Sequence, residues 1–159
     1  MDVRLVEPFI NSTAQIIKDM TGIEVTEDGD QHPEKSDLIL YGVASVITFV
    51  GKIKGRFTID FEPGLAKVII EYLMDEEKPN IQDRLMLGCI SEINNIIAGD
   101  ANTLLNNRYG LGLRLAPPIV FSGKNIVLAA SKLESVTASF KTAYGSFKLN
   151  VAFEGGLAS

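Results

Sequence analysis

Hydrophobic side chains recur every three or four residues near the start of the chain, as at Val6 and Ile10. This period is typical of an amphipathic helix and predicts one over residues 4–21, ended by Gly22. The next segment, residues 26–37, is polar and has no period. We expect it to be a loop whose charged side chains face solvent.

Residues 38–62 have the β-branched and aromatic content of strands. A turn between Gly51 and Gly55 divides this region into two strands and makes it a hairpin. Pro63 suits the first turn of a helix, and the apolar spacing that follows predicts a short helix through Leu73.

The longest periodic segment predicts a helix from residue 80 to about residue 107, with Asn80 as its cap. Residues 113–121 are predicted to be extended and to be broken, or placed at a sheet edge, by Pro117 and Pro118, because proline donates no backbone hydrogen bond.

Alternating apolar residues predict a final hairpin with arms at 136–142 and 147–153 and a turn at Gly145-Ser146. The predicted order of elements is helix, strands, helix, helix, strands. This order favours an α+β fold in a single domain over residues 1–159, with a mainly antiparallel sheet packed against two long helices and one short helix.

A helical wheel of the 80–107 helix puts Ile90, Ile93 and Ile97 on a buried stripe. Glu92 and Asn95 fall on the opposite face, together with two glycines, Gly88 and Gly99. Glycine inside a helix costs about 1 kcal/mol relative to alanine. Two readings remain open: the pair is ordinary solvated surface, or the glycines let a partner approach an acid and an amide closely.

Composition excludes several classes of protein. The chain has 159 residues, one histidine, one cysteine and a formal net charge of -5. One cysteine forms no intramolecular disulfide, and one histidine with one cysteine makes no zinc site, so no metal ligands are predicted. An acidic chain without a basic run is a poor nucleic-acid ligand, and its longest apolar run is too short to cross a membrane. We therefore expect a cytoplasmic protein.

The run from Glu92 to Gly99 resembles the phosphatase motif of the CheC/CheX/FliY family of chemotaxis proteins. That motif is an Asp or Ser, three residues, a Glu, two residues, an Asn, 22 residues and a Pro. Glu92, Asn95 and Pro118 stand at matching positions. Gly88 stands where the family has Asp or Ser. With only one such helix, the chain resembles CheX more than the two-motif CheC.

The resemblance implies a CheC-like fold and a phosphatase that hydrolyses the aspartyl phosphate of a CheY-like response regulator. Asn95 would orient the attacking water, and Glu92 would pair with a lysine of the regulator. Gly88, Gly99 and Pro118 would contact that partner. The chain would need no cofactor of its own, because the partner supplies Mg²⁺.

Family membership also implies a homodimer joined through sheet edges. The alternative to the enzyme is a non-catalytic CheX-like module that sequesters a phosphorylated regulator. The glycine at position 88 keeps this alternative open.

Overall fold

The computed structural model describes residues 2–75, 77–129 and 133–157. Its three helices are α1 (Val3–Thr21), α2 (Pro63–Met74) and α3 (Arg84–Tyr109). The strands of the first half are β1 (Thr26–Glu27), β2 (His32–Glu34), β3 (Leu38–Ile39), β4 (Val43–Val50) and β5 (Lys54–Phe61). Those of the second half are β6 (Arg114–Leu115), β7 (Ile119–Ser122), β8 (Val127–Leu128), β9 (Glu134–Thr142) and β10 (Gly145–Glu154).

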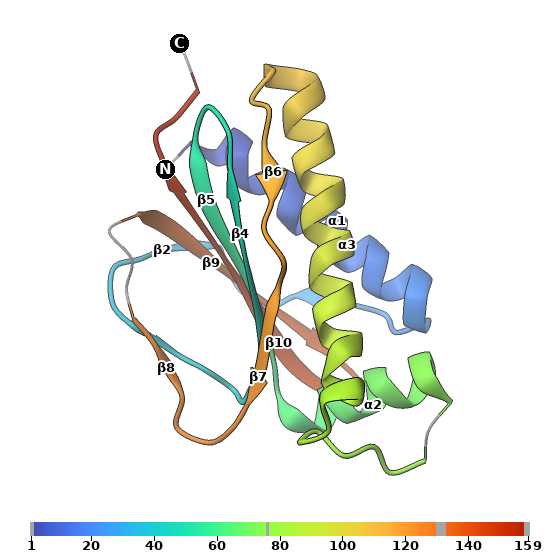
Figure 1. Cartoon of the computed structure of the whole chain (residues 1–159). Coiled ribbons are helices and arrows are strands. Elements are labelled where there is room, and N and C mark those ends of the chain that lie inside the picture. The colour runs from blue at the N-terminus through green and yellow to red at the C-terminus, as the bar shows by residue number, and fades with distance from the viewer. Residues whose placement is uncertain (1, 76, 130–132, 158–159) are drawn as a thin grey trace.

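The main sheet is antiparallel at every described pairing and runs in the order β1-β9-β10-β5-β4-β6. The short strand β2 also pairs with β9, and β7 pairs with β4. The strands β3 and β8 form a separate two-stranded sheet. Helices α1 and α3 lie together on one side of the main sheet (Figure 1). The predicted α+β fold with a mainly antiparallel sheet is therefore confirmed.

The core lies between the helices and the sheet. The ring of Phe9 on α1 lies 5.7 Å from Phe49 and 5.0 Å from Phe57, measured between ring centroids. These three side chains are buried, and alternate residues of β4 and β5 point toward the helices. The residues between them face the other side of the sheet, which the helices do not cover.

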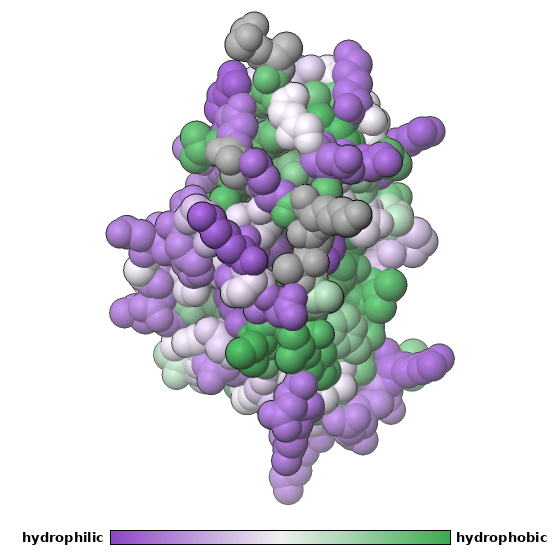
Figure 2. Space-filling view, turned by 90° about the vertical axis from the view of Figure 1, so that its left-hand side faces the viewer, coloured by the Kyte–Doolittle hydropathy of each residue, from purple (hydrophilic) through white to green (hydrophobic). Residues whose placement is uncertain are grey.

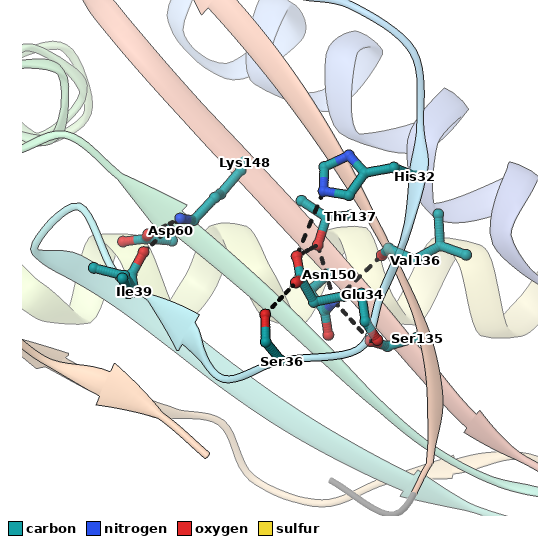
Figure 3. Close-up of polar contacts among 10 residues, drawn as sticks. All are labelled: His32, Glu34, Ser36, Ile39, Asp60, Ser135, Val136, Thr137, Lys148 and Asn150. Atoms are coloured by element: carbon teal, nitrogen blue, oxygen red, sulfur yellow. Dashed lines mark hydrogen bonds and ion pairs between the residues drawn. The ribbon is translucent and has the colours of Figure 1, made fainter. Parts of the chain in front are cut away.

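A polar network attaches the segment of β2 and β3 to this second face (Figure 3). Asn150 on β10 donates to the hydroxyl of Thr137 at 3.2 Å, and that hydroxyl donates to a Glu34 oxygen at 3.1 Å. On the neighbouring strand β5, the buried carboxylate of Asp60 accepts the backbone N–H of Tyr41 at 2.7 Å. Lys148 lies 3.8 Å from the same carboxylate. These contacts hold the segment through side chains as well as backbone.

The small sheet of β3 and β8 leaves apolar side chains exposed. Ile39 and Val127 stand opposite each other and are 71% and 54% exposed. Figure 2, which looks onto the side of the molecule that carries β2 and β8, shows a hydrophobic patch in its lower half among mostly hydrophilic residues. In the described part of the chain, no helix is long and apolar enough to cross a membrane.

Three sequence predictions about local structure are wrong. Residues 26–37 are not a plain loop, because β1 and β2 pair with β9. Such short pairings use backbone groups and leave most side chains exposed, so no alternation marks them. The long helix begins at Arg84, not at residue 80, because Asp83 caps it by accepting the N–H groups of Leu85 and Met86. Asn80 caps only a local turn, at Gln82.

The turn of the last hairpin is also displaced from its predicted place. Gly145 is already the first residue of β10 and pairs with Thr142, so Ala143 and Tyr144 make the turn. The hydroxyl of Thr142 donates to the Gly145 carbonyl at 2.9 Å and accepts the Tyr144 N–H at 3.0 Å. The turn is therefore stabilised by the side chain of Thr142.

Candidate functional site

Helix α3 presents Glu92 and Asn95 to solvent. Both residues are exposed, and neither side chain has a hydrogen bond or ion pair with any other residue that the structure describes. Residues three apart on a helix are neighbours, with about 5–6 Å between their β-carbons. The acid and the amide therefore stand side by side with their polar atoms free to bind a partner.

The opposite side of α3 is fixed to the rest of the molecule. Ile93 and Ile97 are fully buried. The amide of the buried Asn94 donates to the Ser45 hydroxyl on β4 at 2.8 Å. Because these contacts set the rotation of the helix about its axis, Glu92 and Asn95 are held pointing away from the core.

Gly88 and Gly99 flank the pair without serving the packing of the chain. A β-carbon at position 88 would meet no atom within 4 Å, and one at position 99 would meet only Leu115, at 3.9 Å. Gly51, by contrast, has a packing reason to be glycine, since a β-carbon there would lie 2.5 Å from the Leu111 carbonyl oxygen. The two helix glycines therefore lower helix stability with no gain inside this chain.

Pro118 lies between β6 and β7 and is half-buried. The segment that contains it runs along α3 (Figure 1). The structure thus places the three motif positions on two neighbouring elements: Glu92 and Asn95 on the helix, and Pro118 on the adjacent extended segment.

Two exposed apolar residues on α3 were missed by the sequence reasoning. Leu85 is 79% exposed and Ile96 is 36% exposed. On a wheel with Glu92 at zero they fall at about 20° and 40°, on the same face as the pair. The signal was available, because an apolar residue on the polar face of a helix is unusual.

The described residues contain no group of three or more His, Cys, Asp or Glu side chains placed to hold a metal ion. The single cysteine, Cys89, is half-buried on α3, and burial raises the pKa of its thiol. A raised pKa makes the reactive thiolate scarce at neutral pH, so Cys89 lacks the environment of a nucleophile.

This architecture is that of the CheC-like proteins. The structure superposes with a TM-score of 0.88 on a CheC-like superfamily protein from Shewanella sp. PV-4, with 30% identity over 98% of this chain and 100% of that chain. It also superposes with a TM-score of 0.78 on a chain of the CheX-CheY-BeF3-Mg²⁺ complex from Borrelia burgdorferi, with 23% identity over 94% and 97% of the two chains. The second likeness shows the shared fold.

Sequence comparison identifies the family. Residues 43–141 match the model of the family described as chemotaxis phosphatase CheX. The CheY-P phosphatase CheX of Thermotoga maritima is 29% identical over 126 residues, which cover 79% of this chain and 80% of that protein. The chain therefore belongs to the CheX family of chemotaxis phosphatases, as the motif resemblance implied.

Proposed function

We propose that this chain, as a single domain over residues 1–159, hydrolyses the aspartyl phosphate of a CheY-like response regulator through Glu92 and Asn95. The observation that carries the assignment is the exposed, internally unpaired acid and amide on α3. The relative from Thermotoga maritima, a CheY-P phosphatase, supports the choice of substrate.

The reaction joins a water oxygen to phosphorus and breaks the bond between phosphorus and the aspartyl oxygen. The carboxylate of the regulator is released, and the protons of the water leave with the phosphate. An amide suits the positioning of that water, because it both donates and accepts hydrogen bonds and does not ionise. Asn95 therefore orients the water in line with the bond that breaks.

Glu92 serves as the docking group. A carboxylate without an internal partner is free to form a charge-assisted hydrogen bond with a lysine beside the phosphoryl group of the regulator. That contact fixes α3 over the phosphate and thereby places Asn95. The Mg²⁺ ion belongs to the regulator, where it neutralises the charge on the transferred phosphoryl group.

The strip around the pair forms the remaining contact surface. Gly88 and Gly99 leave room for the backbone of the regulator to approach the helix. Leu85 and Ile96, on the same face of α3 as Glu92, supply apolar contacts. Pro118 contributes from the neighbouring segment. The homodimer through sheet edges stays a prediction, and the open edge at β6 and β7 is compatible with it.

The test is phosphate release from a phosphorylated CheY-like receiver protein at substoichiometric amounts of this chain. Acceleration with many turnovers per molecule supports the proposal, whereas binding without acceleration would replace it with the sequestering module. Glu92→Ala should lower kcat/KM about tenfold, the value of one charge-assisted hydrogen bond. Glu7→Ala, which removes an exposed glutamate from α1, is the matched control and should leave kcat/KM unchanged.

A further inference from the structure

A hollow of about 420 Å³ lies at the end of the main sheet where β4, β5, β6 and β10 meet. Cross-strand pairing defines its floor: Arg56 stands between Thr48 and Ala152, and Val50 stands between Lys54 and Arg114. These residues alternate with the ones that face the helices, so the hollow lies on the side of the sheet away from α3. It is thus separate from Glu92 and Asn95.

The hollow carries positive charge that the protein does not neutralise. Arg56 is half-buried, and its Nε atom is buried without a hydrogen-bond partner. Neither Arg56 nor Arg114 forms an ion pair with any residue in the described part of the chain. Among the residues that line the hollow, Glu154 carries the one negative charge, against the positive charges of Lys54, Arg56 and Arg114. Two arginines therefore remain in excess, in a chain whose net charge is -5.

Burial lowers the pKa of Arg56, and desolvation is its only resolved cause. A carboxylate nearby would oppose this effect by favouring the charged form. The direction of the shift therefore agrees with the geometry, in which a partly desolvated guanidinium lacks an anion.

The walls of the hollow are small or apolar. Ala116 and Val50 leave the space open and give it hydrocarbon surface beside the two guanidinium groups. Its volume falls in the range of small-molecule sites, which combine an apolar lining with a few polar groups that fix orientation. Arginine recognises carboxylate and phosphate groups through paired N–H donors.

We propose that this hollow binds a small organic anion, with a phosphate or carboxylate head group on Arg56 and Arg114 and an apolar body against Val50 and Ala116. This site does not depend on the phosphatase assignment. Such a ligand would stabilise this end of the sheet, on the face away from α3.

The probes are phenyl phosphate and benzoate, which share an apolar ring and differ in the head group, with inorganic phosphate as the head group alone. Binding is followed by the shifts of amide NMR signals in the full chain. We expect saturable shifts at Val50, Gly55 and Ala152 for at least one aromatic anion at concentrations up to about 10 mM. Whichever of phenyl phosphate and benzoate binds more tightly identifies the preferred head group.

Arg56→Met and Arg114→Gln should each weaken this binding by about tenfold or more. Arg114 is exposed, so its replacement tests the site even if Arg56→Met perturbs the fold. The matched control is Arg108→Gln, which replaces an exposed arginine at the end of α3. This variant should bind the aromatic anions as tightly as the original chain does. Absence of saturable shifts with all three probes, or equal affinity in Arg114→Gln and Arg108→Gln, would overturn the proposal.

Discussion

Two polar regions of this molecule have opposite relations to the rest of the chain. On the outer face of α3, Glu92 and Asn95 are exposed and have no internal partner among the described residues. Across the sheet, Thr137 and Asn150 are 3% and 2% exposed, and each has at least one hydrogen bond within the chain (Figure 3). The residue types overlap, since both regions contain an asparagine and a glutamate.

The difference lies in where the hydrogen bonds are completed. A buried polar group without a partner costs about 1–3 kcal/mol, so the hydrogen bonds that Thr137 and Asn150 make within the chain contribute to the stability of the fold. An exposed group bears no such cost, because water satisfies it. Its replacement should therefore change binding or chemistry rather than stability. Four substitutions test this separation.

Asn95→Ala should have the largest effect. Loss of the water-positioning amide is expected to lower kcat about 100-fold, or about 2.7 kcal/mol in activation free energy. Partner affinity and the free energy of unfolding should stay within about 0.5 kcal/mol, as is usual for exposed sites. Phosphate release under single-turnover conditions measures the rate. Asn11→Ala on the exposed face of α1 is the control, and full activity in Asn95→Ala would remove Asn95 from the mechanism.

Asp60→Asn should change the pH dependence of stability. Burial raises the pKa of Asp60 from 3.8 to about 6, so the folded state binds a proton more tightly than the unfolded state. The contribution of Asp60 to stability is therefore full below pH 3.8 and is lost as the pH rises to about 6. Two pKa units correspond to about 2–3 kcal/mol.

Urea unfolding from pH 4 to pH 7 measures this contribution. The original chain should lose about 2–3 kcal/mol more than Asp60→Asn over that range. Asp19→Asn, which changes an exposed carboxylate, is the matched control. Parallel stability profiles for the original chain and Asp60→Asn would show that Asp60 is not desolvated as described.

Asn150→Ala should lower the free energy of unfolding by about 2 kcal/mol and leave kcat unchanged. Its amide donates to the Ser135 hydroxyl, the Val136 carbonyl and the buried Thr137 hydroxyl, and the substitution removes all three contacts. Chemical denaturation measures the loss, and Asn107→Ala at an exposed position of α3 is the control. If Asn150→Ala greatly lowered kcat while leaving the free energy of unfolding unchanged, the proposed division of roles between the two regions would be wrong.

Gly99→Ala should have the smallest effect, and it should raise the stability of the fold, whereas Asn150→Ala lowers it. The new methyl group meets only Leu115, at 3.9 Å, so the helix gains about 1 kcal/mol. If a partner approaches closely here, its affinity falls at the same time. Gly64→Ala in α2, also in open space, should give stability without loss of partner affinity. Equal partner affinity in the two variants would leave Gly99 outside the contact surface.

The sequence predicted the features that depend on strong periodicity. The helix over α1, the hairpin of β4 and β5 and the break at Pro117-Pro118 are confirmed. The helical wheel also predicted that Glu92 and Asn95 are exposed. A helix with a single apolar stripe packs that stripe against the core, so residues on the opposite face stay in solvent. Their catalytic roles stay a prediction.

The features that escaped prediction depend on contacts between distant segments or on choices between neighbouring polar residues. The pairing of β1 and β2 with β9 joins residues about 100 positions apart and leaves no local pattern. Both Asn80 and Asp83 are good caps, and only the structure distinguishes them. The hollow at Arg56 was invisible because it forms only when four strands meet.

The anchoring of α3 to β4 through Asn94 and Ser45 has a consequence for the timing of catalysis. A pair of side chains on one well-packed helix needs no lid to close and no segment to order before it works. The backbone positions of Glu92 and Asn95 are fixed when the chain folds, because the buried side of α3 is packed against the sheet. If the proposed roles of Glu92 and Asn95 hold, a regulator meets both residues on one helix whose position does not change on binding.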